Sequence, residues 1–158
     1  MTTSAPPPNL VLRIPPPIWG LFFLIVAYAA QRSSSLFSIL IFRSVPLAVL
    51  FGVGGLAFAS WGRTTFAKED TEIMPTSPAN KKLVTSGPFR FTRNPMYLGL
   101  VLLTLGIALY AGTPPFYAVP VLLFVLCNFV FIPFEEAKMQ RQFNEQYTDY
   151  RRRVRRWI

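Results

Sequence analysis

The sequence contains no histidine and only one cysteine, and these shortages exclude several kinds of site. Without histidine there is no His-based catalytic triad, no HExxH zinc site and no imidazole acid–base catalysis. A single cysteine, Cys127, excludes an intrachain disulfide and a cysteine-rich metal cluster. Because Cys127 lies inside an apolar run, we predict an inert, buried thiol. We therefore expect no metal site.

Charged residues are also scarce, at 15% of the 158 residues, whereas soluble domains carry about 25%. Hydrophobic residues make up 52% of the chain. Lys and Arg number 16 against 7 Asp and Glu, which gives a net charge of +9. In a soluble protein this excess would indicate nucleic-acid binding, but with this hydrophobicity it indicates membrane topology. The composition predicts an integral membrane protein with no nucleic-acid partner.

Four apolar runs follow a proline-rich start. Residues 1–17 include six prolines, so we expect a disordered tail there. The apolar runs cover residues 18–30, 45–61, 96–111 and 116–134. They predict an all-α membrane domain over residues 18–134, with about four transmembrane helices and a cytoplasmic loop at residues 62–94. The third and fourth runs are so close in sequence that they must form an antiparallel hairpin.

Two details of these runs bear on the fold. The first run is short for a span and ends near Ala27-Tyr28-Ala29, which resembles a signal-peptidase site, so a cleaved signal is the alternative to a first helix. In the second run, Gly52-Val53-Gly54-Gly55 lacks the context of a nucleotide-binding loop. Its small residues are more typical of close helix packing.

The positions of the basic residues predict the orientation. In a four-span arrangement, 14 of the 16 Lys and Arg residues fall on one side of the membrane, and only Arg32 and Arg43 fall on the other. The positive-inside rule then places both termini and the 62–94 loop in the cytoplasm. If the chain is bacterial, the membrane is the inner membrane.

Polar groups at the ends of the spans are the candidates for function. Gly87-Pro88 predicts a turn, and Asn94 and Pro95 suit the N-cap and first position of the third helix. At the end of the fourth run, Glu135 and Glu136 are adjacent carboxylates at a membrane boundary. Either Glu135 pairs with Lys138 and Glu136 is solvated, or one carboxylate binds a polar ligand between the helix ends.

Residues 135–158 predict a basic, amphipathic helix in the cytoplasm. Its apolar residues recur at spacings of three and four: Met139, Phe143, Tyr147, Tyr150 and Val154. The helix could lie on an anionic leaflet or fold across the helix ends as a lid, and the sequence does not choose between these.

Together these segments resemble a known family. The stretch LVTSGPFRFTRNPMYLG, the later EE pair and the tail FNEQYTDYRRRVRRWI occur in the order and spacing of the isoprenylcysteine carboxyl methyltransferases. That family comprises integral-membrane, S-adenosylmethionine-dependent enzymes related to the phospholipid methyltransferases. The resemblance covers residues 61–158 and makes residues 135–158 part of the catalytic domain.

The resemblance implies a cofactor site for S-adenosylmethionine and roles for individual residues. Arg93 and Glu136 are implied to be catalytic, orienting the acceptor. The residues implied to bind the cofactor are Lys81, Leu83, Val84, Phe89, Asn94, Pro95, Met96, Tyr97 and Glu135. A glutamate suits the ammonium or ribose diol of the cofactor, and aromatic rings suit its adenine or sulfonium.

Two departures from the family pattern concern the acceptor. Asn94 stands where the family's R-H-P-x-Y motif has histidine, so this position can bind but cannot titrate. Phe131 stands where the eukaryotic enzymes place an arginine that holds the substrate carboxylate. Arg90, Arg93 or Arg141 could replace that arginine, or the acceptor is another lipophilic molecule.

The implied reaction is methyl transfer to a lipophilic acceptor at the membrane–cytosol boundary. Such a displacement at carbon needs alignment and exclusion of water more than acid–base groups, which suits a chain without histidine. Besides isoprenylcysteine carboxyl methylation, the alternatives are phospholipid-type N-methylation, a nicotinamide-dependent membrane reductase and a non-catalytic membrane scaffold.

Overall fold

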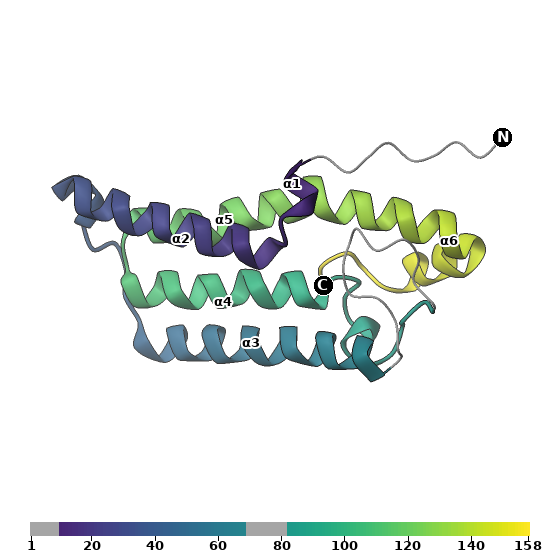
Figure 1. Cartoon of the computed structure of the whole chain (residues 1–158). Helices are drawn as coiled ribbons and strands as arrows, with labels where there is room; N and C mark the ends of the chain where they lie inside the picture. Colours follow the sequence, from purple (N-terminus) through teal and green to yellow (C-terminus); the bar gives the residue numbers. More distant parts are fainter. Residues whose placement is uncertain (1–9, 69–81) are drawn as a thin grey trace.

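The computed structural model describes residues 10–68 and 82–158, which are helical with connecting turns and no strands. The long helices are α2 (Pro16–Ser33), α3 (Val45–Lys68), α4 (Pro95–Ala111), α5 (Pro114–Leu126) and α6 (Ile132–Arg153). Figure 1 shows an elongated bundle in which α4 lies between α3 and α5, and α2 packs on α5. The predicted all-α class is confirmed for the described residues.

The outer surface of this bundle is apolar. Two helical stretches are long and apolar enough to cross a membrane, Val45–Lys68 and Pro114–Arg153, and α4 is a shorter apolar helix. Large apolar side chains exposed on the outside include Leu21, Phe22, Ile25, Leu50, Val53, Leu56, Val121, Leu122 and Phe129. Soluble proteins rarely expose so much contiguous apolar surface. That the chain crosses the membrane four times stays a prediction.

Glycines bring α3 and α4 into close contact. A Cβ added to Gly99 would lie 2.5 Å from the carbonyl oxygen of Gly55, and one added to Gly106 would lie 2.5 Å from the backbone nitrogen of Gly52. A real Cβ atom could not lie so close, so the backbones of α3 and α4 approach each other only because glycine has no side chain at these positions. The packing role predicted for the small residues of the second apolar run is therefore confirmed for Gly55, whereas a Cβ added to Gly52 would meet nothing within 4 Å.

The hairpin predicted between the third and fourth apolar runs is also confirmed. Gly112 ends α4 with φ +76°, a left-handed conformation that suits glycine, and its N–H donates to the carbonyl of Ala108. Pro114 then starts α5, where its fixed φ suits the first helical position. The two helices run antiparallel and share a packed interface (Figure 1).

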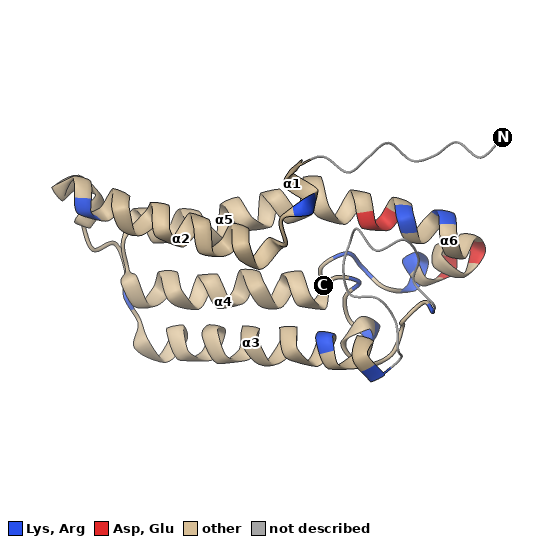
Figure 2. Ribbon diagram, in the orientation of Figure 1, with Lys and Arg blue, Asp and Glu red and all other residues tan. Residues whose placement is uncertain are grey.

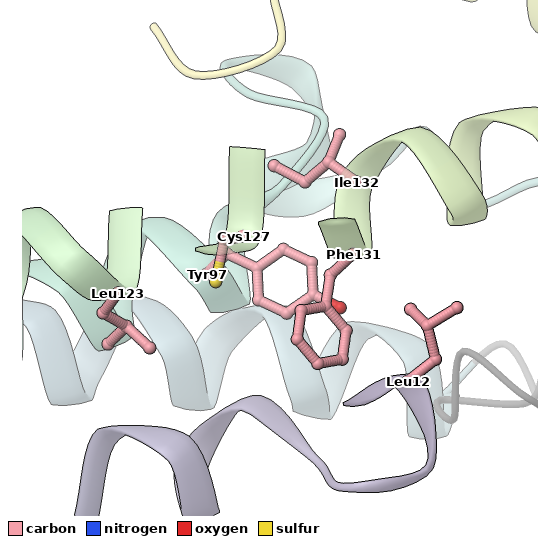
Figure 3. Close-up of a cluster of buried hydrophobic side chains, with 6 residues drawn as sticks. All are labelled: Leu12, Tyr97, Leu123, Cys127, Phe131 and Ile132. Atoms are coloured by element: carbon pink, nitrogen blue, oxygen red, sulfur yellow. The ribbon is translucent and has the colours of Figure 1, made fainter. Parts of the chain in front are cut away.

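Helices α5 and α6 form one continuous stretch joined by a π-helical segment, η3 (Cys127–Phe131). Cys127 and Phe131 are fully buried, and Cys127 is a free thiol, as predicted. Figure 3 shows both in a cluster with Leu12, Tyr97, Leu123 and Ile132, contributed by α1, α4 and the continuous α5–α6 stretch. This cluster fixes the start of α4 against the end of α5.

Three predicted boundaries were wrong. Residues 10–17 are not a disordered tail, because α1 (Leu10–Arg13) is a helical turn with Leu12 buried. Helix α2 then starts at Pro16, since proline suits a first helical position. Residues 1–9 of the predicted tail lie outside the described residues. The second apolar helix continues past residue 61 to Lys68, which shortens the 62–94 loop. The last helix begins at Ile132, bends at Asn144 (φ +44°) and ends at Arg153.

Charge is concentrated at one end of the bundle. Figure 2 shows most described Lys, Arg, Asp and Glu residues around the ends of α3 and α6 and the start of α4. Arg32, in the last turn of α2, and Arg43, just before α3, lie at the opposite end, where Figure 1 shows the end of α2 and the start of α3. The charged end of the bundle therefore holds most of the polar groups that could form a functional site.

Candidate active site

A cavity of about 520 Å³ opens at the charged end of the bundle. Its walls come from α1, the start of α2, the last turns of α3, the segment 82–97 and the first turns of α6. The volume is typical of small-molecule sites, which occupy roughly 300–1,000 Å³. Most lining side chains are apolar or aromatic, and two carboxylates, Glu135 and Glu136, lie among them.

Glu135 lies beside Tyr97 on the wall of the cavity. The Tyr97 hydroxyl donates a hydrogen bond to Glu135 Oε1, which joins the first turn of α4 to the first turn of α6. Glu135 follows the apolar part of the α5–α6 stretch. Burial raises its pKa to about 7, and the hydrogen bond from Tyr97 only partly opposes that rise. Glu135 is thus a carboxyl group near its titration point on the wall of an apolar cavity.

Glu136 has a different environment, because two arginines pair with it. Arg93 Nη2 lies 2.7 Å from Oε1, and Arg156 Nη2 lies 2.6 Å from Oε2. Burial alone would raise the pKa of Glu136, but hydrogen bonds from Arg156 and Arg93 outweigh it and lower the pKa below its ordinary range. The interpretation in which Glu136 is solvated was wrong: its side chain is only 10% exposed.

The last five residues, 154–158, form what we call the C-terminal strap, which returns to the start of α4 (Figure 1). The backbone N–H of Arg93 donates to the carbonyl of Arg155 at 3.0 Å, and its Nη1 donates to the carbonyl of Val154 at 2.6 Å. Asn94 Nδ2 and Thr92 Oγ1 both donate to the carbonyl of Arg156, at 2.9 and 3.0 Å. The strap is therefore held by the residues that precede α4.

Asn94 does occupy the N-cap position of α4, as predicted, but its side chain does not cap the helix. It donates to the strap instead, and the backbone N–H of Asn94 donates to Thr92 Oγ1 at 3.1 Å. Pro95 is the first helical residue, as predicted.

The apolar stripe of the C-terminal helix packs over the site. Tyr147 and Tyr150 are buried against Val84 and Phe89, and the Tyr150 hydroxyl donates to the carbonyl of Phe89 at 2.7 Å. Of the two arrangements left open by the sequence, the structure has the one in which this helix folds across the helix ends. The bend at Asn144 lets α6 extend from the α5 axis and still return over the cavity.

All the predicted site residues that the structure describes line this one cavity: Leu83, Val84, Phe89, Arg93, Asn94, Pro95, Met96, Tyr97, Glu135 and Glu136. Lys81, the remaining predicted cofactor contact, lies outside the described residues. Arg90 and Arg141 are exposed and do not line the cavity, so neither replaces the expected arginine at position 131. Phe131 itself is buried against Tyr97, with ring centroids 6.3 Å apart (Figure 3).

Several lining residues were not anticipated from the sequence. Leu12 and Arg13 come from a proline-rich stretch without helical periodicity, and Arg63 and Phe66 come from the part of α3 beyond the apolar run. Arg156 was one of several arginines in the tail, and no sequence signal distinguished it from its neighbours. Its partner Glu136 is 20 residues away, so only the tertiary fold shows the pair.

Comparison with known proteins adds one result to this geometry. The profile of the phospholipid methyltransferases matches residues 43–146, which is well over half of the chain. The chain belongs to the phospholipid methyltransferase family. No curated protein and no solved structure gave a significant match.

Membership in this family of membrane methyltransferases confirms the broader part of the resemblance found in the sequence. The match covers α3 to α5, most of α6 and the site residues between Leu83 and Glu136. It leaves out α1, α2 and the strap. The narrower isoprenylcysteine group is not distinguished by this match.

Proposed function

We propose that this protein is an S-adenosylmethionine-dependent methyltransferase that modifies a lipophilic acceptor at the membrane boundary. One observation carries the proposal: a carboxylate, Glu135, held by Tyr97 on the wall of a cavity at the charged end of an apolar bundle. The family membership supplies the reaction class. A cavity with apolar and aromatic walls, in which Glu135 is the carboxylate not paired with an arginine, suits a cationic, partly aromatic ligand.

The residues present fit this cofactor. Glu135 can accept hydrogen bonds from an ammonium group or a ribose diol. Phe66 and Phe89 meet edge to face, with centroids 5.0 Å apart, and offer an aromatic wall near the cavity for the adenine. Within the described part of the chain, Arg93 Nε is buried without a hydrogen-bond partner and is therefore a donor available to a carboxylate.

When bound, S-adenosylmethionine would supply an electrophilic methyl group, which would pass to a lone pair of the acceptor as the carbon–sulfur bond broke and its electron pair returned to sulfur. An acceptor carboxylate needs no deprotonation, and an acceptor amine must be neutral when it attacks. The main contributions of the protein to catalysis are therefore to align the two ligands and to exclude water.

We assign Glu136, Arg93 and Asn94 to holding the strap. Glu136 is neutralised by two arginines, and Asn94 donates to the strap carbonyl of Arg156. The catalytic roles implied by the resemblance for Arg93 and Glu136 thus become roles in shaping the cavity. The cofactor contacts proposed here are Leu83, Val84, Phe89, Pro95, Met96, Tyr97 and Glu135, and Arg93 adds its Nε donor.

The acceptor is proposed to be a lipid-type molecule, because exposed apolar side chains surround the bundle and a bilayer would meet the site at its charged end. Two acceptor classes agree with the family and the cavity, a phospholipid amine and an isoprenylcysteine carboxylate. In either case the positive-inside rule places both termini and the site at the cytoplasmic face.

Transfer of a tritiated methyl group from S-adenosylmethionine tests this proposal. The purified protein is assayed with phosphatidylethanolamine nanodiscs and, separately, with N-acetyl-S-farnesylcysteine. We expect label in one acceptor, loss of transfer in Glu135→Gln, and normal transfer in Glu145→Gln, which removes an exposed carboxylate from the same helix outside the cavity. Equal transfer by wild type and Glu135→Gln would contradict the assignment of the site.

A further inference from the structure

The cavity has more positive charge than a cationic cofactor requires. Its lining includes five cationic side chains and two carboxylates: Arg13, Arg63, Lys82, Arg93, Lys138, Glu135 and Glu136. Glu136 is already balanced by Arg93 and by Arg156. Glu135, which accepts from Tyr97 and interacts electrostatically with Lys138, is therefore the carboxylate that faces the cofactor, and the cofactor itself carries net positive charge. The cationic excess calls for an anionic second ligand.

Arg13 and Arg63 are the cations best placed for this role. Both are exposed on the cavity lining, and neither side chain has an ion pair or hydrogen bond with another described residue. They come from opposite parts of the chain, α1 and the last turns of α3. Arginine is suited to phosphate and carboxylate groups because its planar donors can bind two oxygens at once.

The backbone carrying each arginine is fixed by packing. Leu12, next to Arg13, is buried in the core, and Trp19 Nε1 donates to the carbonyl of Val11 at 3.3 Å. Gly62, next to Arg63, lies so close to α4 that an added Cβ would meet Met96 at 3.0 Å. The two guanidinium groups therefore project from anchored positions, which lowers the entropic cost of holding a ligand.

The rest of this part of the lining is apolar, with Leu12, Ala59, Phe66 and Leu100 among the wall residues. An apolar wall with two exposed arginines among its lining residues matches an amphiphile that has an anionic head group and a hydrocarbon tail. Arg13 also lies outside the region matched by the family profile, so it is a feature of this chain beyond what that match covers.

We propose that Arg13 and Arg63 bind the anionic group of the acceptor, a lipid phosphate or an amphiphile carboxylate. The inference rests on the proposed methyltransferase function. It accounts for the loss of the expected arginine at position 131, where buried Phe131 leaves no cation. In this chain the proposed anion-binding groups lie in α1 and near the end of α3 instead of at position 131.

Binding measurements in detergent test the proposal without depending on turnover. The probes are lysophosphatidylethanolamine, N-acetyl-S-farnesylcysteine and, as a neutral amphiphile, monooleoylglycerol. At least one of the first two should bind about tenfold more tightly than the neutral probe. Arg13→Gln and Arg63→Gln should each lower that affinity by about tenfold, the scale of a charge-assisted hydrogen bond. The identity of the preferred probe separates a phosphate from a carboxylate.

Lys68→Gln is the matched control, because Lys68 is an exposed cation on the same helix as Arg63 and does not line the cavity. It should leave all affinities unchanged. If Lys68→Gln weakened binding as much as Arg63→Gln, or if the neutral probe bound as tightly as both probes that carry an anionic group, the proposal would be overturned. S-adenosylhomocysteine binding to wild type is measured in parallel. Its absence would reject the methyltransferase function, whereas its presence without anion preference would reject only the anionic subsite.

Discussion

Arg156 and Glu136 form a two-point ion pair, with Nη2 2.6 Å from Oε2 and Nε 3.2 Å from Oε1. Arg156 belongs to the strap, whereas Glu136 follows the first turn of α6. The pair closes the strap against the cavity wall, and Trp157 adds a hydrogen bond from Nε1 to Asn128 Oδ1 at 3.0 Å. The strap therefore braces the wall of the cavity without lining it.

Replacing Arg156 by Gln should destabilise the protein by about 1–2 kcal/mol. Such a loss is smaller than the roughly 3–5 kcal/mol of a fully broken buried pair, because Arg156 is about one-third exposed and Glu136 keeps Arg93 as a partner. Arg152→Gln serves as control, since Arg152 is exposed and its pair with Asp149 spans 3.6 Å. Thermal unfolding in detergent measures both variants. Equal stability of the two would contradict a closing role for the strap.

Cofactor binding should depend on pH through Glu135. The group must be a carboxylate to attract a cation, and its pKa is raised to about 7. Affinity for S-adenosylmethionine should therefore be full above pH 8 and fall as the pH drops through about 7, approaching tenfold per pH unit. Titration calorimetry from pH 6 to 8 gives the profile. Glu135→Gln should bind weakly and without this dependence; a wild-type profile that is flat would contradict the assignment.

The α3–α4 contact predicts opposite effects for two glycine substitutions. Gly99→Ala places a methyl group against the backbone of Gly55 and Ala59, so the helices must separate, at a cost of roughly 1–3 kcal/mol. Gly54→Ala has nothing within 4 Å and should be neutral or slightly stabilising, since alanine favours helix. Unfolding in detergent compares the pair. Tolerance of Gly99→Ala would show that α3 and α4 are not in direct backbone contact.

The membrane orientation can be tested with single cysteines in a Cys127→Ala background. Ser35 lies between α2 and α3, and Lys68 ends α3. Helix α3 has 24 residues and is about 36 Å long, enough to cross the roughly 30 Å apolar core of a bilayer. Ser35→Cys and Lys68→Cys should react with an impermeant maleimide from opposite sides of sealed vesicles. Reaction of both from one side would exclude α3 as a span.

The helices and their hairpin could be predicted because uninterrupted apolar runs and turn residues are local signals. Gly112 and Pro114 mark the α4–α5 turn in the sequence as clearly as in the structure. The residues around Glu135 could be named in advance through the family resemblance. Local apolar and turn patterns carry this part of the fold.

The strap and the N-terminal turn could not be predicted, because tertiary contacts decide both. Arg93 bonds with strap residues about 60 positions later, and no periodicity reports such a pairing. Leu12 becomes buried only because Tyr97 and Phe131 form a cluster that accepts it. Likewise, Glu135 and Glu136 are adjacent in sequence, yet their side chains acquire different partners, Tyr97 for one and two arginines for the other.

The most direct test of the account is the binding of S-adenosylmethionine and S-adenosylhomocysteine to detergent-purified protein, measured by calorimetry in wild type, Glu135→Gln and Glu145→Gln. The account predicts saturable binding in wild type and Glu145→Gln, and a loss of at least about tenfold in Glu135→Gln. Absence of binding in wild-type protein that is shown to be folded would contradict the methyltransferase function.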